Sequence, residues 1–224
     1  MNTTLNDFEK FAISKGISTN KLNGYKNFNM INPLILEERQ LNVTAIDIYS
    51  RLMYDKIIFL GTPIDSDVAN IINAQLLYLN SITDADEDIK LFINSPGGEC
   101  NSGLAVYDCL NFITPDVSTY CMGMAASMAS ILISSGTKGK RFALPNSRIM
   151  IHQVSTYTGR ITTSDLKIEY DEAKTIQNVL YNILSNNTGK SFEEIEADAD
   201  RDKWFSANEA LSYGLIDEII TKSK

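Results

Sequence analysis

The sequence predicts an α/β fold with a largely parallel sheet. Short apolar segments that are typical of buried strands alternate with longer segments in which apolar residues recur at helical spacing. Turn residues, above all glycine, proline and aspartate, separate the two kinds of segment. Alternation of this kind favours parallel strands with helices packed against them. The chain has 224 residues, which is enough for one domain with a sizeable core.

The first part of the chain differs from the rest. Residues 1–30 are polar and rich in Asn and Lys, and they lack the basic start and apolar block of a signal peptide. We expect a poorly ordered leader, which proteolysis could remove, or a short amphipathic helix. A single domain is then expected over residues 31–224. It opens with an apolar patch at 33–36 and a short helix over 46–53.

The remaining elements are placed by strand-forming residues, caps and breakers. Strands are predicted over 56–60, 89–93, 117–121, 140–144 and 148–152, with a last short strand or tail at 215–220. Helices are predicted over 103–113, 125–135 and 165–185, and Ser-x-x-Glu capping boxes predict two short helices after Ser191 and Ser206. A further helix is capped by Asp65 or Ser66 and has as its apolar positions Val68, Ile71, Ile72, Leu76, Leu77 and Leu79.

The helix over 165–185 is long and polar, with a single apolar stripe. The stripe consists of Leu166, Ile168, Ala173, Ile176, Val179, Leu180, Ile183 and Leu184. If the helix projects from a compact core, the stripe would be exposed in a monomer and would indicate a partner surface. The alternative is that the helix packs back on its own core.

Composition argues against several classes of function. No apolar run reaches the roughly 20 residues of a membrane span. The net charge of −8 argues against a general role in nucleic-acid binding. Three cysteines without metal-ligand spacing favour a reducing compartment, and a single histidine argues against structural zinc. We therefore expect a cytoplasmic protein with no metal or other cofactor in this chain.

The first candidate catalytic residue is Ser127. We expect the strand over 117–121 to turn at Gly123 and to lead into the helix over 125–135, which Gly136 ends. Ser127 would then lie in the first helical turn, where unpaired amides and the helix dipole can stabilise an oxyanion. A serine in such a place is more often only a helix cap, so the interpretation depends on a base nearby.

The candidate base is His152, the sole histidine of the chain, at the end of the strand over 148–152. An imidazole ionises near neutral pH and is the commonest general base in enzymes. A lone histidine at a strand end is nevertheless more often a packed or surface residue. Whether His152 is a catalytic base or only a packed or surface residue therefore depends on the motifs around it.

The turn Asn94-Ser95-Pro96-Gly97-Gly98 follows a predicted buried strand, and its adjacent glycines allow a close backbone approach. It matches neither the G-x-G-x-x-G dinucleotide motif nor the P-loop. The segment 123–127 likewise lacks the G-x-S-x-G pattern of the α/β-hydrolases. By themselves these turns indicate no function.

Five motifs that occur together and in order resemble the ClpP family, the proteolytic subunits of ATP-dependent Clp proteases. They are Ile93-Asn94-Ser95-Pro96-Gly97-Gly98, Met122-Gly123-Met124-Ala125-Ala126-Ser127-Met128, Gly139-Lys140-Arg141, the run from Pro145 to Gln153, and Asp200-Arg201-Asp202. The resemblance extends over about residues 33–220. It implies a ClpP/crotonase-like fold of repeated β-α units with a protruding handle at about 153–186.

The resemblance implies a serine endopeptidase with a Ser–His–Asp triad. By motif match, Ser127 is the nucleophile and His152 is the base. Asp202 matches the acid, although the residues alone do not distinguish it from Asp198 or Asp200.

The family also implies two backbone donors for the oxyanion. They map to the N–H groups of Gly98 and Met128. A glycine at the first position is then understandable, because a side chain there would obstruct an extended substrate backbone.

The family's assembly implies further roles. Similar proteins form two stacked rings of seven subunits and, with a hexameric Clp-type ATPase that uses the ATP, degrade unfolded proteins as well as peptides. The helix over 165–185 would interlock the rings, and Asp200 and Arg201 match a pair that links ring contact to the triad. The segment 33–36 would line the axial pore. Positions of an ATPase-docking pocket, each of which could equally be ordinary core, map to Phe92, Phe112 and Tyr120.

Three departures from the family pattern stand out. After His-Gln the family usually has Pro and then Gly-Gly, whereas this chain has Val154-Ser155-Thr156-Tyr157, which predicts a stiffer handle strand. Lys90 replaces a usual aromatic residue of the docking pocket. The run Cys100-Asn101-Ser102 is expected to alter the first substrate subsite. None of these departures removes a triad residue.

Two other functions stay open at this point. A crotonase-like acyl-CoA enzyme also uses paired backbone donors for an oxyanion, but it does not need the Ser–His–Asp set. A non-catalytic ring subunit would bind partners only, and such relatives lose triad residues.

Overall fold

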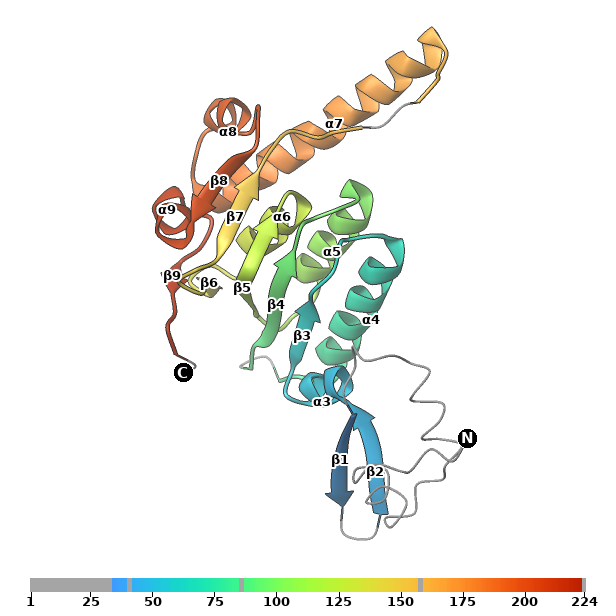
Figure 1. Ribbon diagram of the computed structural model, residues 1–224, viewed down its shortest axis with the longest axis vertical. Helices are drawn as coiled ribbons and strands as arrows, with labels where there is room; N and C mark the ends of the chain where they lie inside the picture. Colours follow the sequence, from blue (N-terminus) through green and yellow to red (C-terminus); the bar gives the residue numbers. More distant parts are fainter. Residues whose placement is uncertain (1–33, 40–41, 85–86, 157–158, 223–224) are drawn as a thin grey trace, which may run out of the picture. The chain divides into compact units, whose positions relative to one another are not determined.

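The computed structural model describes residues 34–39, 42–84, 87–156 and 159–222 (Figure 1). The chain divides into two compact units, with the boundary between Asp55 and Lys56. The expected leader, residues 1–30, lies outside the described residues. The domain limits 1–30 and 31–224 therefore remain predictions.

The first unit contains a hairpin followed by a short helix. Strand β1 (Leu34–Arg39) pairs antiparallel with β2 (Asn42–Asp47), and helix α3 (Ile48–Tyr54) follows at once. The side chain of Asp47 accepts hydrogen bonds from the amides of Tyr49 and Ser50 at 3.1 and 3.0 Å. The helix predicted over 46–53 therefore exists, but this cap starts it at residue 48.

The second unit contains a sheet of seven strands. They are β3 (Ile57–Leu60), β4 (Ile89–Ser95), β5 (Val117–Ala126), β6 (Arg141–Ala143), β7 (Arg148–Ile151), β8 (Lys203–Ser206) and β9 (Glu218–Ile219). The order is β3-β4-β5-β6-β9, and β7 pairs with the far end of β5 and with β8. All these pairs are parallel except β7–β8. The predicted α/β fold with a largely parallel sheet is confirmed.

Helices cover one face of this sheet. They are α4 (Ser66–Ile82), α5 (Cys100–Phe112) and α6 (Met128–Ser134), whereas α7 (Thr163–Thr188), α8 (Phe192–Asp198) and α9 (Ala207–Tyr213) follow later in the chain (Figure 1). Ile89, Leu91, Ile93 and Ser95 are buried on β4, whereas the residues that alternate with them, Lys90, Phe92 and Asn94, are exposed or only partly buried. This alternation shows that the opposite face of the sheet is only partly covered.

Strand β5 is longer than predicted. It continues through Gly123 to Ala126, because Met124, Ala125 and Ala126 pair in parallel with β7. Helix α6 consequently begins at Met128 and ends at Ser134. The prediction that Ser127 lies inside the first helical turn is therefore wrong, because this residue is the link between strand and helix.

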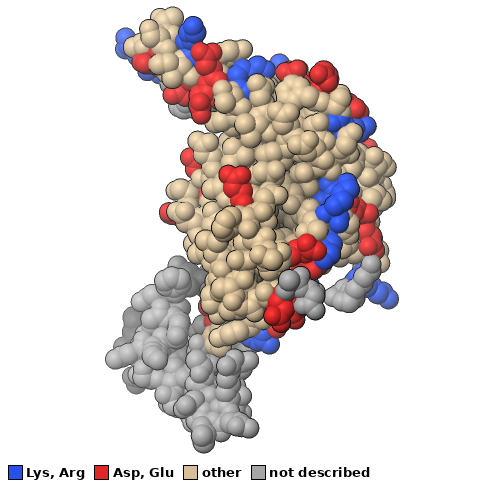
Figure 2. All heavy atoms as spheres, turned by 180° about the vertical axis from the view of Figure 1, so that it is seen from behind, with Lys and Arg blue, Asp and Glu red and all other residues tan. Residues whose placement is uncertain are grey.

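Helix α7 combines the two environments considered for it. Leu180, Ile183 and Leu184 are buried, so the C-terminal half of the helix packs on its own core. Leu166 and Ile168 in the N-terminal half are 48% and 65% exposed. Figure 1 shows this half extending away from the sheet, and charges of both signs gather there (Figure 2). Only part of the predicted stripe is thus available to a partner.

A second exposed apolar surface lies on helices α4 and α5. Ile71 and Leu77, which were predicted as core positions, are 59% and 47% exposed, and Ala69 is buried in their place. Tyr78 and Ile82 on α4 and Phe112 on α5 are also exposed. Figure 2, which shows the molecule from behind, has a broad area with few charged side chains.

The short C-terminal helices α8 and α9 begin at the capping serines that the sequence predicted. The hydroxyl of Ser191 accepts from the amide of Glu194, and Ser206 and Glu209 form a complete capping box at the start of α9. Gly214 ends α9 with a φ of +94°. The handle strand predicted at Val154-Ser155-Thr156-Tyr157 is absent from the described residues, since no strand occurs in them between 152 and 162.

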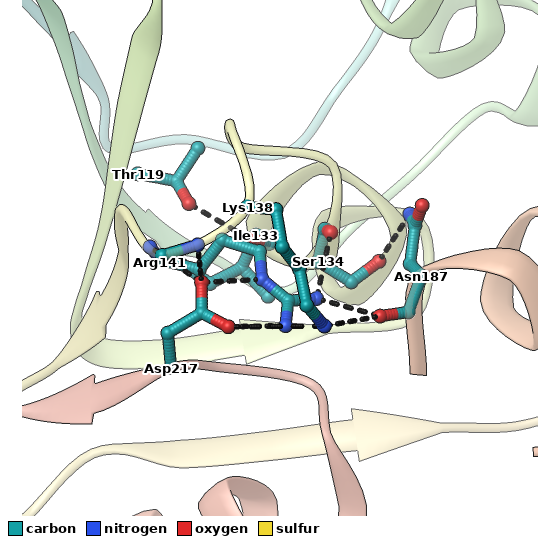
Figure 3. Close-up of polar contacts among 8 residues, drawn as sticks. Thr119, Ile133, Ser134, Lys138, Arg141, Asn187 and Asp217 are labelled. Carbon is teal, nitrogen blue, oxygen red and sulfur yellow. Dashed lines mark hydrogen bonds and ion pairs between the residues drawn. The ribbon is translucent and has the colours of Figure 1, made fainter. Parts of the chain in front are cut away.

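A buried ion pair joins four elements of the second unit (Figure 3). The side chain of Arg141 is 1% exposed, and it donates to both carboxylate oxygens of Asp217 at 2.8 and 2.6 Å. Its remaining guanidinium nitrogen donates to the carbonyls of Asn187 on α7 and Ser134 on α6. Burial acts to raise the pKa of Asp217, but the hydrogen bonds and charge of Arg141 outweigh it and lower that pKa.

No described helix combines the length and the apolar character that crossing a bilayer requires. Nor do His, Cys, Asp and Glu side chains gather in threes that could hold a metal ion within the described ranges.

Candidate active site

Three predicted site residues meet at one edge of the sheet. Ser127 follows β5, His152 follows β7, and Asp202 precedes β8. Because β5 and β7 are parallel neighbours, their carboxyl ends lie together. Ligands and catalytic groups of α/β proteins commonly gather at this edge.

The backbone holds Ser127 in an unusual conformation. Its φ is +55° and its ψ is −126°, a combination that residues with a side chain rarely adopt. The amide of Ser127 donates to the carbonyl of Met150, and its carbonyl accepts from the amide and hydroxyl of Ser130. A strained strand–serine–helix turn of this kind exposes the hydroxyl, as in the elbow of α/β-hydrolases, although the G-x-S-x-G pattern is absent.

The imidazole of His152 bridges the other two residues. Its Nε2 atom lies 2.8 Å from Oγ of Ser127, and its Nδ1 atom lies 3.1 Å from Oδ1 of Asp202. A carboxylate only accepts hydrogen bonds, so Nδ1 carries the proton of the neutral ring. Nε2 is then free to accept from the serine hydroxyl.

The register of β7 and β8 explains why Asp202 reaches the imidazole. The last paired residues are Ile151 and Lys203, so His152 and Asp202 are the next opposite positions of the same antiparallel ladder. Nothing in the local sequence of 200–202 reveals this pairing. The contact between Asp202 and the imidazole of His152 is therefore a consequence of the fold and could not be inferred from the local sequence.

The other two aspartates have different partners. Asp198 accepts from Nζ of Lys203 at 2.5 Å and from the hydroxyl of Tyr213 at 2.8 Å. Burial acts to raise the pKa of Asp198, but these partners lower it. Asp200 contacts Gln153 and lies 3.7 Å from Nε of Arg201, and both charged side chains are largely exposed. Among the three aspartates, Asp202 is the one in contact with His152.

The positions of Gly98 and Met128 suit an oxyanion site. Met128 is the first residue of α6, so its N–H has no acceptor within the helix. Gly98 forms a parallel bridge with Ile64, in which the flanking residues make the hydrogen bonds and the N–H of Gly98 faces the other way. Both residues line the same pocket as Ser127 and His152. A Cβ atom at position 98 would lie 2.1 Å from the carbonyl oxygen of Ile64, so glycine is required.

A cavity of about 60 Å³ adjoins the serine, and both apolar and polar residues line it. Its lining includes Met128, Ile131, Leu180 and Leu184, together with Gly98 and Cys100. Burial, together with the charge of Glu99, raises the pKa of the Cys100 thiol. The thiol therefore stays neutral near pH 7 and acts as a small apolar wall.

Sequence reasoning missed two residues beside this cavity, Tyr181 and Gln153. Tyr181 is 2% exposed, and its ring contacts that of Phe192 edge-on. Its helical spacing from Gln177 and Leu184 placed it on the buried side of α7, which is the only signal that could have found it. Gln153 ends the motif that begins at Pro145, but the motif assigned it no role of its own.

The residues predicted to form an ATPase-docking pocket do not all line the same pocket. Phe92, Tyr120 and Phe142 stack in a row, with ring centroids 4.5 and 4.9 Å apart. They line a pocket of about 270 Å³ together with Lys90. Phe112 is 76% exposed and is not part of the pocket lining.

Known proteins resemble this chain over nearly its whole length. A family model described as Clp protease matches residues 39–223. The chain therefore belongs to the Clp protease family.

Its relatives within the family are similar over almost their whole length. The chain is 50% identical to a protein of Porphyromonas gingivalis over 98% of this chain and 100% of the relative. It is 49% identical to a protein of Bacteroides fragilis, over 97% of this chain and 100% of the relative. A protein of Bacteroides thetaiotaomicron is 51% identical over 86% of each chain. All three are named ATP-dependent Clp protease proteolytic subunit.

Proposed function

We propose that this chain is a serine endopeptidase and serves as the proteolytic subunit of an ATP-dependent protease. The observation that carries the proposal is the hydrogen-bonded chain from Ser127 Oγ through His152 to Asp202, with distances of 2.8 and 3.1 Å. Nucleophile, base and orienting acid need this geometry. The names of the relatives support the same class of reaction.

The first step acylates the serine. Oγ of Ser127 attacks the scissile carbonyl carbon while Nε2 of His152 takes the hydroxyl proton, and the carbonyl oxygen becomes an oxyanion. The N–H groups of Gly98 and Met128 donate to that oxygen. Nε2 then passes the proton to the leaving amine, and the peptide C–N bond breaks.

The second step releases the acyl group. A water molecule gives its proton to Nε2 of His152 and attacks the acyl carbon, after which Oγ of Ser127 leaves and regains a proton. Asp202 keeps the ring in the required tautomer and stabilises the imidazolium form. The imidazole can act as the base only in its neutral form.

The two alternatives are less well supported. A crotonase-like acyl-CoA enzyme has no need of a serine that is hydrogen-bonded to an imidazole and an acid. A non-catalytic subunit would lack at least one of Ser127, His152 and Asp202, all of which are in contact here.

We further propose that the chain assembles as two stacked heptameric rings that work with a hexameric Clp-type ATPase in the cytoplasm. The exposed apolar residues of α4 and the exposed half of α7 support contacts between subunits. Asp200 and Arg201, which are exposed beside the triad, would lie at the ring–ring contact. The aromatic row beside Lys90 would receive the ATPase, which uses the ATP, so this chain itself would need no cofactor.

The test is covalent labelling of the full chain with a fluorophosphonate, read out by intact mass and paired with hydrolysis of a fluorogenic peptide. We expect one adduct per chain, and Ser127→Ala should abolish both labelling and hydrolysis without affecting assembly, because only a hydroxyl is lost. Ser212→Ala is the control, since Ser212 is an exposed residue on α9, away from the pocket that holds Ser127. Hydrolysis at the wild-type rate by Ser127→Ala would refute the assignment.

A further inference from the structure

Gln153 directly follows the catalytic histidine and reaches across to the segment that carries the acid. Its Nε2 atom donates to the carbonyl oxygen of Asp200 at 2.5 Å and lies 3.4 Å from Oδ1 of the same residue. Gln153 is therefore attached to both sides of the His152–Asp202 contact. One side is the covalent bond to His152, and the other is a hydrogen bond two residues before Asp202.

The segment 200–202 has few other attachments. The backbone ladder of β7 and β8 ends at the pair Ile151–Lys203, one position before His152 and Asp202. The side chains of Arg201 and Asp202 are 89% and 62% exposed. Among the described residues, the hydrogen bonds that reach 200–202 from outside come from Gln153 and from His152 itself.

The exposure of Asp202 makes this attachment important. Water competes for an exposed carboxylate, so its hydrogen bond to the imidazole persists only if the backbone keeps the carboxylate in place. A displacement of about 1 Å in such a contact can lower a rate about 100-fold. The Gln153 amide extends the hydrogen bonding of the β7–β8 ladder to the far side of Asp202.

We propose that Gln153 is a positioning residue of the peptidase reaction, which fixes the segment 200–202 against β7 and so keeps Asp202 on His152. This inference rests on the proposed function. Gln153 acts through Asp202 and does not itself exchange protons with the substrate.

Two variants of the full chain test the proposal. Gln153→Ala removes the donor, and Gln153→Glu keeps the size of the side chain but replaces the donor with a carboxylate beside Asp200. Both should lower kcat for a fluorogenic peptide by about 10- to 100-fold and leave KM within about 2-fold. Gln75→Ala on α4, far from the site in the fold, should match the wild type.

A double-mutant cycle separates positioning from a general structural role. In an Asp202→Asn background, Gln153→Ala should lower kcat no further, because the group through which it acts is already altered. Rates are compared on the assembled fraction isolated by gel filtration, since Asp200 and Arg201 are also expected at a subunit contact.

Several outcomes would overturn the inference. They are an unchanged kcat in Gln153→Ala, a rise in KM alone, an effect that adds fully to that of Asp202→Asn, and a fall in rate confined to unassembled protein. The wild-type reaction with the fluorophosphonate is measured in the same series. Its absence would instead refute the proposed function.

Discussion

The geometry of single residues determines what the site can do. Ser127 adopts a φ of +55°, and the glycines opposite it, Gly97 and Gly98, have φ values of +90° and +154°. The turn after β4 and the turn after β5 approach each other so closely that a Cβ atom at Gly97 would lie 2.7 Å from the Cβ of Ser127. Glycine at position 97 is thus a consequence of where the nucleophile lies, whereas glycine at position 98 is required by the backbone of Ile64.

This contact leads to a prediction about Gly97→Ala. The new methyl group would meet the carbonyl oxygen of Ala126 at 2.5 Å and the amide of Met128 at 2.8 Å, so Ser127 or its neighbour must shift. We expect peptide hydrolysis to fall about 100-fold.

The matched control is Gly139→Ala. Gly139 has a similar φ of +86°, but nothing lies within 4 Å of the added Cβ. Gly139→Ala should lower the free energy of unfolding by about 1–2 kcal/mol because of backbone strain, and it should leave kcat unchanged. Equal kcat values for the two assembled variants would contradict the steric argument.

For single residues, the sequence predicted much of the site. The positions of Ser127 and His152 follow from the motifs, and the structure brings them together. The choice of Asp202 over Asp198 and Asp200 could not come from residue chemistry, because all three are aspartates in one acidic run. Tyr181 and Gln153 were missed because their importance depends on neighbours distant in the sequence.

Among the elements, β8 brings the acid to the site, since it pairs antiparallel with β7 and Asp202 directly precedes it. We predict that Asp202→Asn lowers kcat by about 10⁴-fold, because the amide favours the wrong imidazole tautomer. Hydrolysis and assembly are measured together.

Asp198→Asn is the comparison for this variant. It disturbs the contacts with Lys203 and Tyr213, so it should lower the thermal unfolding midpoint but affect kcat far less. A larger fall in kcat at Asp198 in fully assembled protein would show that the acid is wrongly assigned.

Helix α7 provides a second contrast at the element scale. Leu184→Ala opens a space in the core and should lower the free energy of unfolding by about 2–5 kcal/mol. Ile168→Ser, at a 65% exposed position, should leave that free energy nearly unchanged but weaken assembly. Unfolding curves and sedimentation distinguish the two. Assembly that is insensitive to Ile168→Ser at micromolar concentration would argue against a subunit contact here.

The types of the helices and strands were predicted better than the residues at which they begin and end. Strand and helix types follow from composition and caps, and most predicted segments are present in the described residues. The extension of β5 to Ala126 was missed because Gly123 and the alanines favour a turn and a helix locally, whereas pairing with β7 keeps them extended. The exposure of Ile71 and Leu77 was also unpredictable, since apolar spacing does not say whether the protein's own core covers a given position.

Across the whole second unit, the Arg141–Asp217 pair joins β6, α6, α7 and the segment before β9 (Figure 3). Asp217→Asn leaves the buried guanidinium without a counter-charge and should lower the free energy of unfolding at pH 7 by about 3–5 kcal/mol. The contribution should depend on pH. The folded-state pKa of Asp217 lies below the unfolded value, so the stabilisation is present above about pH 4 and is lost as the pH falls through the folded pKa.

Thermal unfolding of wild type and Asp217→Asn across this range tests the linkage. The gap between their midpoints should be constant at neutral pH and should close below about pH 4. A gap that is the same at pH 3 and pH 7 would mean that the charge of Asp217 contributes nothing.

The late position of β8 in the chain has a consequence for biosynthesis. His152 and Asp202 are 50 residues apart, so at about 5–20 residues per second a ribosome needs about 2.5–10 s to pass from one to the other. During this interval the growing chain already contains the nucleophile and the base, but β7 has no β8 to pair with and the imidazole has no acid. Each copy of the enzyme is therefore inactive while it is being synthesised. It can hydrolyse peptides only after the last quarter of the polypeptide has been made and β8 has paired with β7.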